Sequence, residues 1–104
     1  MFNIFDLPRG IDREEAFETL LINQRLRIER IVSAGQVSAE GFWYDQNQHE
    51  WVMLVQGEAR LGWEDGRRQD LKAGDCLLIR AHEKHRVEYT SQEPPCIWLA
   101  VHYE

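Results

Sequence analysis

Two residues in separate apolar segments are the best candidates for chemistry. Glu50 alternates with Val52 and Leu54, and His85 alternates with Val87. In extended chain these neighbours share one face, so both polar side chains should point toward the protein interior. A carboxylate buried without a partner is costly, so we expect Glu50 to meet a metal ion, an arginine or a histidine. Without a ligand, His85 would be a core histidine satisfied by hydrogen bonds.

Of the other three histidines, one lies in a predicted turn and two lie on predicted strands. His82 lies three residues before His85, across a predicted tight turn that would let both imidazoles face one ion. His49 directly precedes Glu50, and neighbouring residues on a strand point to opposite faces, so a regular strand cannot aim both into one pocket. His102 shares a face with Trp98 and Ala100, and its inward or outward sense stays open. Exposure to water is the alternative reading for all three.

The segments that position these residues begin with one predicted helix. Asp12 can cap a helix over residues 12–21, Glu15 follows three residues later, and a helical apolar stripe continues to Leu21. After this segment the spacing of the apolar residues changes from the helical period to the alternation of a strand. Apolar residues from Leu26 to Val32 alternate with charged ones that include Arg27 and Glu29, which predicts a strand with one face in water.

The rest of the chain predicts strands only. His49 to Val55 is apolar on both faces and is typical of a central strand. Asp65-Gly66 favours a type I′ turn between two antiparallel strands, the first with Ala59, Leu61 and Trp63 on its apolar face. Further strands are expected over residues 76–79, 85–90 and 96–103. The pattern predicts an all-β domain of about seven to nine strands, arranged as a sandwich or barrel.

Two segments resemble the motifs of the cupin superfamily, small β-barrels often built around one metal ion. The first motif, G-x5-H-x-H-x3,4-E-x6-G, is half present as Glu50 to Gly57. The second, G-x5-P-x-G-x2-H-x3-N, keeps Gly74 and His85, with Arg80, His82 and Tyr89 in place of Pro, Gly and Asn. The resemblance covers about residues 36–103. It implies a double-stranded β-helix, also called a jelly-roll barrel, here with a short N-terminal helix.

The resemblance also implies a ligand set. In metal-loaded cupins the two histidines of H-x-H, the glutamate and the later histidine hold the ion. The H-x-H positions fall here on Tyr44 and Gln46, or on Trp43 and Asp45, so only two ligands carry over. Asp45 is the best formal substitute, because a carboxylate suits iron, manganese or zinc. The first hypothesis is therefore that the barrel holds one divalent ion of Fe, Mn, Zn or Ni and binds a small organic ligand. The ion would be coordinated by some of these residues: Glu50, His85, His82, Asp45 and His49.

The second hypothesis is a cupin without a metal that binds or senses a small molecule, with Arg80 or Arg86 pairing an anionic ligand. Aromatic side chains, including Tyr44 and Trp98, would pack in the core, in a dimer interface or around the pocket. No nucleophile elbow, phosphate loop or Ser/His/Asp order is present. Catalytic residues, and whether a reaction occurs, therefore stay unknown.

Composition sets the frame for both hypotheses. The 104 residues carry a net charge of −6, which argues against nucleic acid as a partner. The absence of a signal sequence or a long apolar stretch predicts a cytoplasmic protein that has no membrane contact. Cys76 and Cys96 are expected to be buried free thiols. We expect one domain, with residues 1–34 as an arm and 35–104 as the barrel, and a homodimer that covers further apolar surface.

Overall fold

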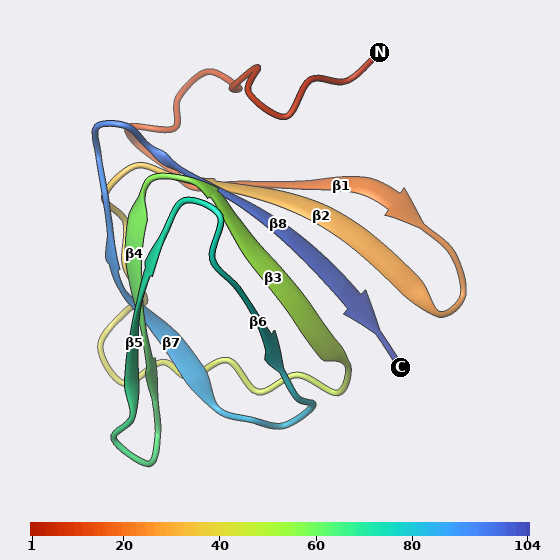
Figure 1. Ribbon diagram of the computed structural model, residues 1–104, viewed down its shortest axis with the longest axis vertical. Coiled ribbons are helices and arrows are strands. Elements are labelled where there is room, and N and C mark those ends of the chain that lie inside the picture. Colours follow the sequence, from red (N-terminus) through yellow and green to blue (C-terminus); the bar gives the residue numbers. More distant parts are fainter.

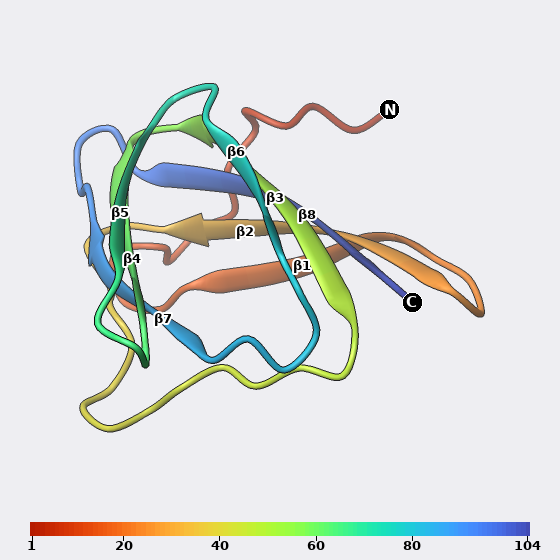
Figure 2. The ribbon, with the colours of Figure 1, turned by 60° about the horizontal axis from the view of Figure 1, so that its bottom comes forward.

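Two antiparallel β-sheets face each other across the core. The computed structural model describes all residues 1–104. The larger sheet has the order β1-β2-β8-β3-β6 and the smaller one the order β5-β4-β7. Figure 1 shows the two sheets meeting at an angle, and Figure 2 shows them from a second side. The strands are β1 Ala16–Ile22, β2 Leu26–Ser33, β3 His49–Gln56, β4 Glu58–Trp63, β5 Arg68–Lys72, β6 Cys76–Ile79, β7 His85–Thr90 and β8 Cys96–Tyr103.

The hydrophobic core lies between the sheets and is built from alternate residues of each strand. Leu54 and Trp98 come from the larger sheet, and Ala59 and Leu61 from the smaller one. The predicted alternation on β4 is confirmed, because Ala59, Leu61 and Trp63 are all buried. The predicted central position of β3 is also confirmed, since it lies between β8 and β6.

The predicted N-terminal helix over residues 12–21 is wrong. At the start of this range the local backbone hydrogen bonds are those that Arg13 and Glu14 donate to the Gly10 carbonyl, which form a turn and not a helix. The chain then extends as β1, which pairs with β2 from Ala16 opposite Val32 onward. Antiparallel pairing with β2 satisfies the backbone without a helix, and a bulge between Thr19 and Leu21 absorbs the helix-like spacing of the apolar residues.

The N-terminal segment lies across the outer face of the larger sheet and is held there by a buried arginine. The Arg30 guanidinium donates to the backbone carbonyls of Ile4 at 3.0 Å and Asp6 at 2.6 Å. It also forms an ion pair with Glu18 at 2.6 Å and lies over the ring of Phe2. In Figure 1 this segment is the red stretch that leads into β1. Strands from both sides of residue 34 thus share one sheet.

The β4–β5 hairpin forms as predicted, but its turn differs from type I′. Gly66 has a φ of 96° and Asp65 has no positive φ. Trp63 accepts a hydrogen bond from the Gly66 N–H and donates one to the Arg67 carbonyl. One positive φ at glycine is typical of a type I turn followed by a bulge, which needs a longer loop than the two-residue turn.

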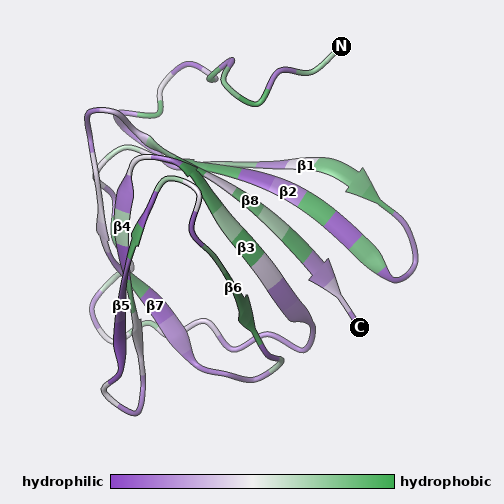
Figure 3. Ribbon diagram, viewed as in Figure 1, coloured by the Kyte–Doolittle hydropathy of each residue, from purple (hydrophilic) through white to green (hydrophobic).

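One exposed residue corrects the sequence interpretation, and a second shows the effect of a register shift. Cys96 is buried, but Cys76 is exposed, because it lies on the edge strand β6. Tyr89 is also exposed, because the β4–β7 register shifts between Arg60 and Leu61 and turns Tyr89 to the outer face. Figure 3 shows that β6 is hydrophobic along its whole length, whereas β2 alternates between hydrophobic and hydrophilic residues. None of the elements is a helix that could cross a membrane.

Candidate functional site

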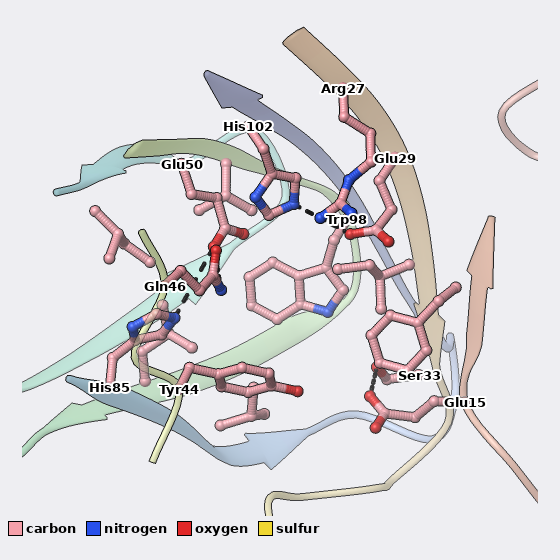
Figure 4. A pocket seen from close by; sticks show the side chains of 16 residues that line it. Glu15, Arg27, Glu29, Ser33, Tyr44, Gln46, Glu50, His85, Trp98 and His102 are labelled. Atoms are coloured by element: carbon pink, nitrogen blue, oxygen red, sulfur yellow. Dashed lines mark hydrogen bonds and ion pairs between the residues drawn. The ribbon is translucent and has the colours of Figure 1, made fainter. Parts of the chain in front are cut away.

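A cavity of about 220 Å³ opens between the two sheets, and half of its sixteen lining residues are hydrophobic when Tyr44 is counted among them. Trp98 lies at its centre, with polar side chains around it (Figure 4). The polar lining comes from β2, β3, β7 and β8, from the segment before β1 and from the loop before β3. These residues are Glu15, Arg27, Glu29, Ser33, Tyr44, Gln46, Glu50, His85 and His102.

Three of the charged or titratable residues form a row across neighbouring strands. Arg27 on β2 pairs in register with His102 on β8, and His102 pairs with Glu50 on β3. Side chains at paired positions lie on the same face of a sheet. The row therefore places all three on the cavity side. This resolves the open question about His102, which points inward and is 4% exposed.

Glu50 and His85 meet inside the barrel, as the alternation predicts. Both are buried, at 7% and 5% exposure, and the Glu50 Oε1 atom lies 4.0 Å from the His85 Nε2 atom. That separation is too long for a hydrogen bond. Glu50 accepts one bond, from the Gln46 side-chain amide at 3.3 Å. The His85 Nδ1 atom lies 2.9 Å from the Glu83 carbonyl.

Tyr44 and Gln46 occupy the cavity wall where the H-x-H positions were expected. Tyr44 pairs with His85 through two backbone hydrogen bonds of 2.7 and 3.2 Å, and the two rings stack at 5.4 Å. Burial raises the pKa of the Tyr44 phenol, and Glu15, Glu50 and Glu29 raise this pKa further. The phenol is thus kept neutral, and three carboxylates act on one point of the cavity.

The other two cavity carboxylates also have one hydrogen-bond partner each. Glu29 Oε1 lies 3.2 Å from the Nε2 atom of His102, and His102 is buried while Glu29 is partly buried. Glu15 accepts a bond of 2.6 Å from the Ser33 hydroxyl. Of the three, Glu50 has the longest hydrogen bond, and its donor is the neutral Gln46 amide.

Two arginines have a buried Nε atom with no hydrogen-bond partner, Arg27 and Arg86. Arg27 lines the cavity. Arg86 does not, since it donates to the Ser38 carbonyl and lies 5.8 Å from the Trp43 ring. Neither Arg80 nor Arg86 lines the cavity, so the predicted anion-pairing arginines are not at this site.

His82 and Asp45 lie together outside the cavity. The His82 Nδ1 atom is 2.8 Å from Asp45 Oδ1, and both side chains are substantially exposed. The His82 N–H also donates to the Gln46 carbonyl at 2.7 Å. The pair therefore braces the loop that brings Gln46 to the cavity wall. The predicted turn exists, and His82 has a φ of 63° within it.

His49 lies on the outer face of the sheet, as predicted from the inward direction of the adjacent Glu50. Its Nδ1 atom accepts a hydrogen bond from the Ala81 N–H at 3.0 Å, and its ring lies against Tyr103. Of the five predicted ligands, the structure thus brings together Glu50 and His85 and keeps the other three apart from them.

The donors do not fit a tightly held transition-metal ion. A divalent metal in a protein usually has three or four carboxylate, imidazole or thiolate ligands. No group of three or more such side chains is placed to hold an ion. Tyr44 and Gln46 offer a neutral phenol and an amide, which are weak substitutes.

Arg27 and Glu29 were missed because their strand was predicted to turn its charged face to water. The opposite holds, since both line the cavity and the outer face carries Ile28 and Val32. The signal that could have found them is the pairing of β2 with β8, which puts Arg27 beside His102. Pairing of distant strands is not encoded in local alternation.

Comparison with known proteins agrees with this architecture. The cupin domain family matches residues 30–102. A protein of Ralstonia eutropha JMP134, provisionally named a mannose-6-phosphate isomerase, is 44% identical over 100% of this chain and 97% of its own, with a TM-score of 0.92. No curated protein matches significantly.

More distant structures share the fold alone. A cupin superfamily protein of Desulfitobacterium hafniense DCB-2 is 18% identical, with a TM-score of 0.74 over 88% of this chain and 78% of its own. An RmlC-like cupin of Methanocaldococcus jannaschii with a double-stranded β-helix fold is 16% identical, with a TM-score of 0.73 over 99% and 91%. Because the family matches residues 30–102 and the structure has the two facing sheets of this fold, the chain is a member of the cupin family.

Proposed function

We propose that this cupin binds a small polar organic molecule in the barrel cavity, directly through protein side chains and without a metal. The observation that carries the proposal is the lining, in which apolar walls surround a few convergent polar groups. This composition is typical of sites for small ligands. A cavity of about 220 Å³ is smaller than most drug-sized pockets, so it suits a molecule of only a few carbon atoms.

The charge of the lining limits the class of ligand. Three glutamates and one arginine give it a formal charge of −2 when both histidines are neutral. A phosphate monoester carries about −1.5 to −2 charges at neutral pH, so it would be repelled. We therefore expect mannose 6-phosphate, after which the Ralstonia eutropha relative is named, not to bind to this chain.

The alternative is a metal-dependent site, which one observation favours. Glu50 and His85 face each other across 4.0 Å, and an ion between them would need further ligands from water or substrate. Asp45, His82 and His49 would have to move to join them. In this alternative the ion would polarise a bound ligand as a Lewis acid.

One set of measurements separates the two. Tag-free protein is analysed for Fe, Mn, Zn and Ni after supplementation, and small polar metabolites are then screened by NMR of the Trp98 indole. We expect less than stoichiometric metal and ligand-dependent shifts that persist with chelator. Filling the cavity with Val87→Phe should abolish the shifts, whereas the exposed control Val37→Phe should keep them. Stoichiometric metal that is lost in His85→Ala would overturn the proposal.

A further inference from the structure

The Arg27 side chain marks one end of the cavity as a site for an acceptor. Its Nε atom is buried and has no hydrogen-bond partner. Nearly all buried donors in folded proteins are paired, and an unpaired one is costly. The neighbouring carboxylate of Glu29 is engaged by His102, and no ion pair joins it to Arg27. The missing partner is therefore an acceptor that the protein itself does not supply.

Glu50 lies toward the other end of the cavity, where its carboxylate could accept further hydrogen bonds from a ligand. Its side chain is 9% exposed, and its only hydrogen bond is the 3.3 Å contact from the neutral Gln46 amide. A carboxylate has about four acceptor sites, so most of its capacity is free. Glu15 and Glu29 also contribute to the negative potential that raises the pKa of nearby Tyr44. A cationic donor fits this end.

The two ends have a fixed spacing. Arg27 and Glu50 lie on β2 and β3, separated by His102 on β8. Neighbouring strands are about 4.8 Å apart, so the two Cα atoms are roughly 10 Å apart, and both side chains extend over the cavity. The space left between the charged groups suits a short chain. Trp98 and the apolar wall lie beneath it (Figure 4).

We propose that the cavity binds a small zwitterion, with its ammonium group at Glu50 and its carboxylate at Arg27. This inference rests on the proposed function and names the class of its ligand. Taking about 30 Å³ for each water, the cavity has room for about seven water molecules, which is close to the size of a short amino acid. A dication or a dianion would leave one end mismatched.

Matched ligands test the proposal. Straight-chain ω-amino acids from glycine to aminohexanoate are titrated calorimetrically at neutral pH, each beside the alkylamine and the alkanoate of the same chain length. We expect one or two chain lengths of amino acid to bind at least about tenfold more tightly than either partner compound, as two charge-assisted contacts require. Equal binding of the amine and the amino acid, or of the alkanoate and the amino acid, would overturn the inference.

Matched variants assign the two ends. Arg27→Gln should weaken the amino acid about tenfold and leave the amine unchanged, whereas Arg86→Gln, which also alters a buried unpaired Nε, should change neither. Glu50→Gln should weaken both compounds, and the exposed control Glu58→Gln neither. Equal effects of Arg27→Gln and Arg86→Gln would contradict the assignment.

The outcome also separates this inference from the proposed function. If the metabolite screen finds cavity ligands that are neutral or carry one charge, the proposed function stands and the zwitterion inference fails. If no compound of any class shifts the Trp98 indole, both fail.

Discussion

Tyr44 shows how one side chain reports the charge of the whole cavity. Its phenol is partly buried, and the carboxylates of Glu15, Glu29 and Glu50 line the same cavity, so burial and negative charge both oppose formation of a phenolate. The same conditions make Tyr44 a poor metal ligand and a good neutral hydrogen-bonding group for a polar ligand. The residue that replaces a histidine of the family motif thus changes the chemistry of that position.

The raised pKa of Tyr44 predicts a loss of stability at alkaline pH. The folded pKa lies above the ordinary value of 10.0, so the unfolded chain releases this proton first. The contribution to the free energy of unfolding is therefore complete below about pH 10 and is lost as pH rises through the folded pKa. The free energy of unfolding, measured with urea from pH 8 upward, should fall with pH in this way. The Tyr44→Phe variant should show a smaller fall.

Tyr89→Phe is the matched control, because Tyr89 is half exposed on the outer face of β7. It should keep the slope of the unmodified protein. A slope that Tyr44→Phe leaves unchanged would contradict the account of the cavity potential.

Among the elements, the N-terminal segment and β1 form a unit around one buried charge. Arg30 is 2% exposed, and its guanidinium binds the carbonyls of Ile4 and Asp6 together with the carboxylate of Glu18. A buried charge that is fully hydrogen-bonded can hold a segment with little regular structure in place. The edge strand β1 and the segment before it thus depend on a residue of β2.

We predict that Arg30→Met releases this segment. Loss of a buried, paired charge typically costs about 3 kcal/mol, because its partners stay behind. Chemical denaturation should show a fall of this order, and hydrogen exchange at residues 1–10 should become fast. The exposed control Arg25→Met should change neither quantity. Equal stability of the two variants would show that the segment is held by other contacts.

Element by element, the sequence predicts the fold well wherever the pattern is local. The strands of the barrel follow from alternation, as Ala59 and Leu61 on β4 show. The N-terminal helix fails because pairing with the distant strand β2 overrides the helical spacing of Phe17, Leu20 and Leu21, and a bulge between Thr19 and Leu21 absorbs the irregular pattern. Pairing also decides the site: Glu50 and His85 follow from alternation, whereas Arg27 needs the β2–β8 register.

At the scale of the molecule, the outer face of the larger sheet is poor in charge. Apolar side chains from four neighbouring strands share it, and the N-terminal segment covers only the part around Arg30. The half-buried or exposed residues of this face are Ile28, Trp51, Met53, Cys76, Leu78, Leu99 and Val101. A contiguous apolar face on a small domain marks an interaction surface.

We propose that a second copy of the chain covers this face, because a single self-complementary patch closes a two-fold dimer. Sedimentation should give twice the mass of the 12.3 kDa chain, and Leu78→Glu should shift the protein toward monomer. Val37→Glu, which changes an exposed apolar residue in a loop, should leave the mass unchanged. Cys76 gives an independent readout, since its alkylation should slow as protein concentration rises, while buried Cys96 stays unreactive at every concentration. A monomer whose Cys76 reacts at one rate throughout would exclude this interface.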